Sequence, residues 1–337
     1  MNAESPTVAT GAGTTARNVL AVISPHVGGR STGAALATLF PAHARVTVVE
    51  SADEDPVALR EAHVVITGLA PVSAEHLAAA EQLELVQCAS HGFDYVDVDV
   101  ARARNVTVCN IGSSGAEKQN VAEQTFALML ALAKRLIPAH TALVEADWAL
   151  PRLQGSITEL SGKTLGVVGL GHIGQEVARR AVAFDMTVLY AGRRSVGAET
   201  EARLGGARRV ELDELLRVSD YVTLHAPLTD ATRHLLDADR LALLKPTAFV
   251  VNTARGALID QDALADALES GALAGAGIDV FDPEPPTPAL RLLRAPNVVL
   301  SPHVGGVTRE TLVRIGLAAV QNVTGFLADE APRDVVS

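Results

Sequence analysis

A glycine-rich loop and a pair of arginines in the second half of the chain have the residue types and spacing of anion-binding groups. Gly169-Leu170-Gly171-His172-Ile173-Gly174 follows the apolar run TLGVV and precedes a segment of helical period. Between a strand and a helix, a G-x-G-x-x-G string is a specific signal of a dinucleotide-binding loop. Its glycines allow a tight turn, close approach of the backbone to a pyrophosphate, and close packing of helix on strand. The phosphates would lie on the free N–H groups at the positive end of the helix.

The end of the next apolar run, YAGRRS, predicts which dinucleotide binds. About twenty residues after the first glycine, an NAD enzyme usually carries a carboxylate that accepts hydrogen bonds from the ribose hydroxyls. This chain has Gly192 there, followed by Arg193, Arg194 and Ser195. Guanidinium groups bind phosphate bidentately, so the sequence predicts a preference for NADP(H), with NAD(H) possible. In the alternative interpretation, one arginine only extends along the surface with its charge in water.

The elements that position these residues follow from a regular alternation along the chain. Short β-branched apolar runs alternate with Ala/Leu-rich segments of helical period, which predicts parallel strands joined by crossover helices. The predicted fold class is α/β, with two Rossmann-like doubly wound parallel-sheet domains and an active-site cleft between them. The expected strands are 19–23, 45–49, 64–68, 84–88 and 106–110 in the first half, and 164–169, 186–191, 221–226, 248–253, 274–279 and 297–302 in the second.

Domain boundaries are placed from the same pattern. Residues 1–17, small and polar, are expected to form a disordered tail. Residues 18–114 together with 307–337 are expected to form the substrate (catalytic) domain, and residues 115–306 the dinucleotide-binding domain. Segment 117–137 is apolar around most of its circumference, which predicts a helix buried between domains or subunits. A homodimer is expected.

Composition excludes several classes of partner and site. The 39 acidic residues exceed the 28 Lys and Arg, for a net charge of -11, which argues against a general nucleic-acid or anionic-membrane binder. Cys88 and Cys109 each end an apolar run, as expected of buried reduced thiols in a cytoplasmic protein. No His/Cys cluster has metal-ligand spacing, so no metal is expected.

Three later segments place polar side chains at the ends of expected strands, the edge where an open α/β sheet binds its ligand. They are VVNTARGALID, GAGIDVFDPEPP and VVLSPHVGG. GLGHIG, LHAPLT, NTARG, DVFDPEP and SPHVGG occur in this order along the chain. From about residue 18 onward the sequence therefore resembles the D-isomer-specific 2-hydroxyacid dehydrogenase family, which includes glycerate, phosphoglycerate, hydroxypyruvate/glyoxylate and formate dehydrogenases.

The resemblance implies a catalytic set of Arg255, Glu284 and His303. Arg255 would hold the substrate carboxylate and polarise the keto oxygen, a task suited to a planar bidentate donor. His303 would give a proton to the forming alkoxide in reduction and take it back in oxidation. Glu284 would hydrogen-bond His303 and fix its tautomer. Asp282 lies two residues earlier and is a competitor for that role, although its position does not match the family's.

The same resemblance places the cofactor contacts along this edge, with Asp279 at the nicotinamide carboxamide. The expected cofactor-binding residues are Gly169, Gly171, His172, Ile173, Gly174, Gly192, Arg193, Arg194, Ser195, His225, Ala226, Pro227, Thr232, Thr253, Asp279 and Gly305.

The substrate side departs from the family pattern in two loops. CASHGFDYVDVD resembles the loop whose backbone N–H groups bind the substrate carboxylate, so Ser90, His91 and Gly92 are expected to bind substrate together with Arg255 and His303. His91 is bulkier than usual: either it reaches a second polar or anionic group on the substrate, or it is an exposed loop histidine. NIGSSGAEKQNVAEQ is about two residues longer than the family's usual loop and carries Glu117 where Asn is common. Loops of this kind set side-chain discrimination.

These observations predict an NADP(H)-preferring oxidoreductase that reduces a small anionic 2-keto acid to the D-2-hydroxy acid. One alternative keeps the fold but oxidises phosphite or a phosphono-acid, using His91 and Lys118. Another, from a different class, is a dinucleotide-sensing interaction protein that has lost catalysis. The intact set of Arg255, Glu284 and His303 argues against that second alternative.

Overall fold

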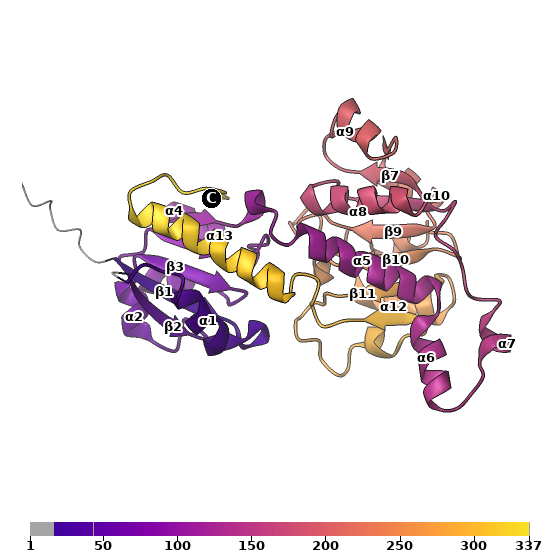
Figure 1. Ribbon diagram of the computed structural model, residues 1–337, viewed down its shortest axis with the longest axis horizontal. Helices are drawn as coiled ribbons and strands as arrows, with labels where there is room; N and C mark the ends of the chain where they lie inside the picture. Colours follow the sequence, from indigo (N-terminus) through magenta and orange to yellow (C-terminus); the bar gives the residue numbers. More distant parts are fainter. Residues whose placement is uncertain (1–16, 43, 337) are drawn as a thin grey trace, which may run out of the picture. The chain divides into compact units, whose positions relative to one another are not determined.

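The computed structural model describes residues 17–42 and 44–336. These residues form two compact units, one made of the chain up to Ser114 together with Ile315 onward, and the other of Gly115–Arg314 (Figure 1). The second crossing falls inside α13 (Arg309–Leu327), later than the expected residue 307. Residues 1–16 of the expected tail lie outside the described residues. Arg17 donates hydrogen bonds to the Phe326 carbonyl and the Asp329 carboxylate.

The unit that contains the N-terminal half is a five-stranded parallel sheet in the order β2-β1-β3-β4-β5. Each strand expected in this half of the chain is present. The apolar runs of four strands are buried in the sheet, and only the edge strand β2 is partly exposed. The strand order reverses between β1 and β3, the switch point of a doubly wound sheet. The strands are β1 Asn18–Ile23, β2 Arg45–Val49, β3 Val64–Gly68, β4 Leu85–Cys88 and β5 Thr107–Cys109; the helices are η1 Pro25–Val27, α1 Gly29–Ala37, α2 Pro56–Glu61, α3 Ala74–Ala79, α4 Val98–Ala103 and η2 Gly112–Ser114.

The Gly115–Arg314 unit is a seven-stranded parallel sheet in the order β12-β11-β10-β9-β6-β7-β8. The six strands expected here are present, and β8 (Arg208–Arg209) was missed. It has two exposed arginines and no apolar run, so only its pairing with β7 reveals it. The other strands are β6 Thr164–Val168, β7 Thr187–Ala191, β9 Tyr221–Leu224, β10 Phe249–Asn252, β11 Gly275–Ile278 and β12 Val298–Leu300.

Helices cover both faces of this sheet, so alternate side chains of each strand enter different cores. On β7, Val188 and Tyr190 pack in the core that includes α5 and α8, whereas Leu189 packs in the core that includes α10 and α12. The helices of this unit are α5 Lys118–Ala133, α6 Leu136–Val144, α7 Leu150–Leu153, α8 His172–Ala183, α9 Ala198–Arg203, α10 Leu212–Val218, α11 Ala238–Leu241, η3 Gly256–Leu258, α12 Gln261–Glu269 and η4 Arg291–Arg294.

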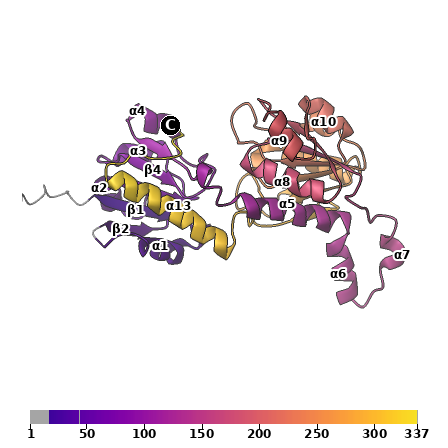
Figure 2. The same cartoon turned by 45° about the horizontal axis from the view of Figure 1, so that its top comes forward.

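The apolar segment 117–137 differs from the expected single helix. It breaks after Ala133, and α5 and α6 are bent by 62° to each other (Figure 2). The burial of α5 comes from the sheet of its own unit: a Cβ on Gly277 of β11 would lie 2.9 Å from the Cβ of Leu128. Within the described residues no single helix is long and apolar enough to cross a membrane, and only the bent α5–α6 pair reaches that length and composition.

Candidate functional site

The glycine loop between β6 and α8 has the geometry that a pyrophosphate requires. Gly169 has a φ of +94°, and a Cβ there would lie 2.8 Å from the backbone of His225. A Cβ on Gly174 would lie 2.2 Å from the Gly169 carbonyl oxygen, so helix and strand pack closely only with glycine. A Cβ on Gly171 would meet nothing within 4 Å, and no side chain among the described residues caps the start of α8 at His172. Ile173 lies in the same first turn. The open space before an uncapped helix N-terminus fits a dinucleotide phosphate.

The chain after β9 lies directly beside this loop. The His225 N–H donates to the Val168 carbonyl at 2.8 Å. Its ring Nε2 is buried without a hydrogen-bond partner among the described residues, and burial lowers the pKa of His225 to about 3. The imidazole is therefore neutral and leaves an unsatisfied polar atom, as expected where a ligand completes the site. Ala226 follows, and the Thr232 hydroxyl donates to the Pro227 carbonyl at 2.7 Å, which closes the loop.

At the end of β7, Gly192, Arg193 and Arg194 are exposed, and neither arginine side chain has a partner in the described part of the chain. Ser195 has partners within the turn. Its hydroxyl donates to Glu201 at 3.1 Å and accepts from the Gly197 N–H at 3.1 Å. Its role in binding a phosphate stays a prediction.

Arg255, Glu284 and His303 follow three neighbouring strands, β10, β11 and β12, at the same edge of the sheet. Glu284 Oε2 lies 2.7 Å from His303 Nδ1, and Glu284 Oε1 accepts from the Phe281 N–H at 2.8 Å. Burial alone raises the pKa of Glu284, but the hydrogen bond to His303 and the charge of Arg255 hold it below its usual range. Asp282 pairs with Arg233 at 3.2 Å instead. Of the two candidate carboxylates, Glu284 is the one that contacts His303.

A close backbone approach brings Arg255 into this set. A Cβ on Gly256 would lie 2.0 Å from the Phe281 carbonyl carbon, so only glycine lets the chain after β10 pass the chain after β11. Asn252 donates from Nδ2 to the Arg255 carbonyl at 2.8 Å and fixes the backbone on the other side. The local sequence N-x-x-R-G thus sets the position of the backbone that carries the Arg255 side chain.

His303 is held in the left-handed region with a φ of +54°, by contacts to a buried carboxylate. Asp279, 1% exposed, accepts from the Ser301 hydroxyl at 2.5 Å, the Val304 N–H at 3.1 Å and the Gly305 N–H at 2.8 Å. Burial raises the pKa of Asp279. The sequence predicted a nicotinamide contact for Asp279 and a cofactor contact for Gly305. Here both oxygens of Asp279 hold the loop that carries His303.

Helix α5 supports the same edge, a role that the sequence analysis missed. Gln124 donates to the Ser301 hydroxyl at 2.9 Å, and the Thr125 hydroxyl lies 3.0 Å from that of Thr253, both threonines being buried. The signal was present, because Gln124 and Thr125 are polar residues within a helix that is apolar around most of its circumference. Thr253 therefore shapes the site through its hydroxyl, against α5.

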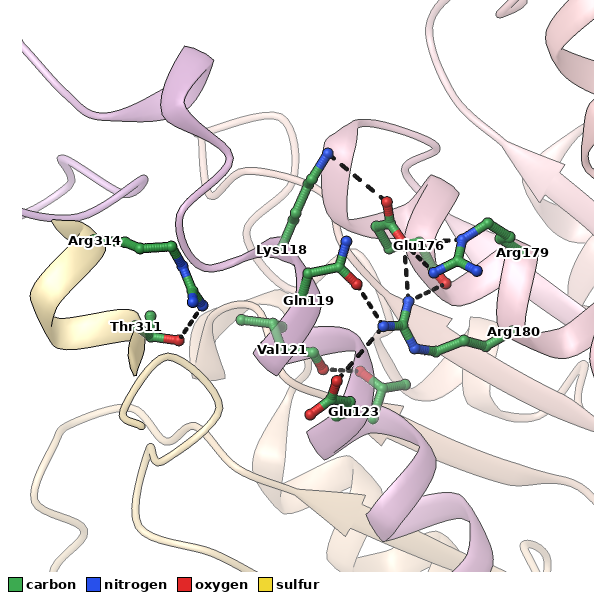
Figure 3. A network of polar contacts seen from close by, with 10 residues as sticks. Lys118, Gln119, Val121, Glu123, Glu176, Arg179, Arg180, Thr311 and Arg314 are labelled. Atoms are coloured by element: carbon green, nitrogen blue, oxygen red, sulfur yellow. Dashed lines mark hydrogen bonds and ion pairs between the residues drawn. The ribbon is translucent and has the colours of Figure 1, made fainter. Parts of the chain in front are cut away.

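A second polar network links the start of α5 to α8 (Figure 3). Glu176 binds Arg179 and Arg180 at 2.9 Å each and lies 3.7 Å from Lys118 Nζ, while Arg180 donates to Gln119 at 2.6 Å. The network fixes the helix that begins at the glycine loop. Lys118, which the phosphono-acid alternative uses together with His91, is paired with Glu176 here.

The expected substrate loop lies in the other unit. The Ser90 hydroxyl donates to the Gly92 carbonyl at 2.7 Å and lies 2.6 Å from the Tyr95 hydroxyl, so it shapes the loop. Asn110 Nδ2 donates to the His91 carbonyl at 2.8 Å. The N–H groups of Ser90 and Gly92 have no acceptor within the described residues. Their role in binding substrate stays a prediction.

The hexapeptide SPHVGG occurs twice, which the sequence analysis overlooked: at Ser301–Gly306 and at Ser24–Gly29, directly after β1. In the first copy along the chain, His26 lies on the exposed 3-10 helix η1, with its N–H bonded to the Ser24 hydroxyl at 3.3 Å. Within the described residues no group of three or more His, Cys, Asp and Glu is arranged to hold a metal ion.

Comparison with known proteins agrees with this geometry. Residues 126–305 match the family model described as D-isomer specific 2-hydroxyacid dehydrogenase, NAD binding domain. The chain is 39% identical over 262 residues to hydroxypyruvate reductase from Thermotoga maritima, covering 77% of this chain and 83% of that protein. It is 39% identical over 284 residues to glyoxylate reductase from Aeropyrum pernix, covering 82% and 84%.

Among solved structures, an acyclic imino acid reductase (Bsp5) in complex with NADPH and D-Arg superposes with a TM-score of 0.81 at 26% identity, covering 95% of this chain and 100% of that one. Fold, site geometry and sequence relatives agree. The chain therefore belongs to the D-isomer specific 2-hydroxyacid dehydrogenases, nicotinamide-dinucleotide-dependent oxidoreductases that act on the CH–OH group of their donor.

Proposed function

We propose that this enzyme is an NADP(H)-preferring reductase of small 2-keto acids, with a product of D configuration. The observation that carries the proposal is the contact of Glu284 with His303 beside Arg255, at the sheet edge that also bears the glycine loop. Relatives named as hydroxypyruvate and glyoxylate reductases support the substrate class. The exposed Arg193 and Arg194, together with the NADPH complex of a structural neighbour, support the cofactor preference.

The proposed roles follow from the chemistry of each group. Arg255 offers planar donors to the substrate carboxylate and to the keto oxygen, and so draws electron density from the keto carbon. A bound nicotinamide dinucleotide supplies the hydride that this carbon accepts. His303, with Nδ1 bonded to Glu284, gives the proton on Nε2 to the keto oxygen as it becomes an alkoxide. The Glu284 carboxylate accepts from Nδ1 and so orients the ring for that transfer.

The deciding experiment measures NADPH and NADH oxidation across glyoxylate, hydroxypyruvate, pyruvate, phenylpyruvate and phosphonopyruvate. We expect turnover with at least one simple 2-keto acid, and a higher kcat/KM with NADPH. Activity confined to phosphite or phosphono-acids would favour the alternative oxidoreductase. A protein that binds NADPH but turns over none of these compounds would support the dinucleotide-sensing alternative.

We also infer a homodimer formed through α6, α7 and the chain between them. This segment projects from its unit (Figures 1 and 2) and exposes large apolar side chains, with Val144 and Trp148 exposed by 72% and 71%. An exposed apolar patch of this kind is unusual on a monomer. A second copy of the same chain is always present in solution and can cover it. Light scattering after size exclusion tests it. Val144→Glu/Trp148→Glu should reduce the mass to 35.1 kDa, whereas Val57→Glu, at an exposed valine of the other unit, should not.

A cytoplasmic location is part of the same proposal. Its support is that both cysteines, Cys88 and Cys109, are free and buried, as is common for proteins of a reducing compartment. Fractionation of the native cells is the test.

A further inference from the structure

The edge strand β8 brings an arginine to the position where the dinucleotide-binding sheet selects its cofactor. β8 pairs in parallel with β7, with Leu189 opposite Arg208 and Tyr190 opposite Arg209. Successive side chains of a strand point to opposite faces of a sheet, so the two arginines of β8 diverge. Arg208 lies 3.5 Å from Glu214 of α10. Arg209 reaches in the other direction.

Arg209 binds the backbone of Gly192, the residue that stands where an NAD enzyme usually carries a ribose-binding carboxylate. Its Nε donates to the Gly192 carbonyl at 3.0 Å and its Nη2 donates to the same oxygen at 2.9 Å. A guanidinium has five N–H donors, so three remain. No other partner of Arg209 is present in the described part of the chain. The group therefore lies next to Gly192 with its charge uncompensated.

The charges around Gly192 are mostly positive. Arg193 and Arg194 follow it directly, exposed and without side-chain partners in the described residues. Glu201, a carboxylate of α9, accepts from the Tyr190 hydroxyl at 2.5 Å and from the Ser195 hydroxyl at 3.1 Å. These two bonds engage Glu201 with groups other than the three arginines. A dianionic phosphate beside Gly192 would meet three guanidinium groups.

We propose that Arg209 is a specificity-determining residue that binds the 2′-phosphate of the cofactor, together with Arg193 and Arg194. The two hydrogen bonds from Nε and Nη2 to the Gly192 carbonyl, called the Arg209 fork below, orient the guanidinium before the cofactor binds. Little side-chain entropy of Arg209 is therefore lost on binding. Arg209 thus offers donors beside position 192, where an NAD enzyme usually carries a carboxylate acceptor. The proposal rests on the proposed NADP(H) preference and adds a residue outside the YAGRRS segment.

The test uses binding to the full-length protein, not turnover. Isothermal titration compares adenosine 2′,5′-bisphosphate with 5′-AMP, two ligands that differ only in the 2′-phosphate. Arg209→Ala should weaken bisphosphate binding about tenfold or more, the effect of losing one charge-assisted hydrogen bond, and leave 5′-AMP binding within about twofold. Arg209→Lys should fall between wild type and Arg209→Ala, because it keeps the charge but not the fork. Arg208→Ala removes the neighbouring charge and should match wild type.

The outcomes separate this proposal from the one it rests on. If the wild-type protein binds both ligands equally, the NADP(H) preference is wrong and Arg209 has no phosphate to bind. If the wild type prefers the bisphosphate and Arg209→Ala keeps that preference, the role of Arg209 is wrong while the cofactor preference stands. Equal loss of both ligands in Arg209→Ala would show that the fork only shapes the Gly192 turn, and would overturn the proposal. If Arg208→Ala weakened bisphosphate binding as much as Arg209→Ala, the loss of affinity would come from the change in net charge, and the specific role of Arg209 would be wrong.

Discussion

Glu284 and His303 are joined by a hydrogen bond of 2.7 Å between Oε2 and Nδ1, although the two residues are 19 positions apart. The pKa of Glu284 is below its usual range, so its carboxylate only accepts and Nδ1 carries the hydrogen. Nε2 is then the nitrogen that exchanges a proton. This one contact gives the imidazole its tautomer and its orientation, and most of the expected chemistry depends on it.

His303→Ala should lower kcat by about 10²- to 10⁴-fold, the usual contribution of a positioned general acid, and leave NADPH affinity close to wild type. Steady-state kinetics and a fluorescence titration measure the two quantities. The SPHVGG copy at Ser24–Gly29 provides a matched control: His26→Ala should keep wild-type kcat. Comparable turnover in His303→Ala and wild type would refute the proton-transfer role.

Glu284→Gln should remove a pH-dependent part of the stability. The folded pKa of Glu284 is lowered, so its contribution is present above the ordinary value of 4.5 and is lost as pH falls through the folded pKa. The urea midpoint of wild type should therefore fall more steeply than that of Glu284→Gln as the pH drops below about 5. Parallel curves for the two proteins would mean that Glu284 is not held ionised by His303 and Arg255.

Asp279→Asn should damage the His303 loop while leaving the glycine loop intact. An amide offers one oxygen where the carboxylate offers two, so the N–H of Val304 or of Gly305 loses its acceptor. We expect a loss of about 1–3 kcal/mol in the free energy of unfolding and a lower kcat. NADPH affinity should change little. A variant with wild-type kcat and stability would contradict the positioning role of Asp279.

Gly174→Ala and Gly171→Ala should separate folding from binding within one loop. A methyl at 174 would press on the Gly169 carbonyl and destabilise the protein by about 1–3 kcal/mol. A methyl at 171 meets open space and should leave the melting temperature unchanged. It should weaken dinucleotide binding about tenfold, because it enters the volume expected for the pyrophosphate. Thermal melting and NADPH titration of both variants measure this. Equal NADPH affinity in Gly171→Ala and wild type would place the pyrophosphate elsewhere.

Arg193→Ala/Arg194→Ala should raise the KM for NADPH about ten- to a hundredfold and the KM for NADH by less than about twofold, because only the first cofactor carries the 2′-phosphate. Arg203→Ala/Arg208→Ala removes two exposed positive charges nearby and serves as the control. A similar rise for both cofactors would assign Arg193 and Arg194 to general surface charge.

The local sequence pattern was sufficient to predict much of this protein's structure. Each expected strand exists, because a β-branched apolar run between helical segments has few other ways to bury itself. The glycine loop was also predictable, because each glycine in its pattern has a backbone reason. Gly169 adopts a positive φ, and Gly174 allows the helix to pack closely on the strand. The contact of Glu284 with His303 was expected from resemblance and is present.

Other features depended on contacts that local sequence does not encode. β8 exists because β7 offers an edge to pair with, and the donor of Ser195 is taken by Glu201, which lies a turn of chain away. Asp279 holds the His303 loop because the tertiary fold brings the Val304 and Gly305 N–H groups to its oxygens. In each case a polar group found its partner only after the chain had folded.

The two SPHVGG copies separate the two kinds of information most directly. The sequence determined that both follow a strand and turn at its end, since Pro and the paired glycines interrupt the strand pattern. In Ser24–Gly29 the left-handed residues are Gly28 and Gly29, and the string forms η1 and begins α1. In Ser301–Gly306 the left-handed residue is His303, bonded to Glu284 and carried on a loop that Asp279 holds. Six identical residues adopt two conformations because only one copy lies against the buried carboxylate of Asp279 and the carboxylate of Glu284, and tertiary structure alone supplies these partners.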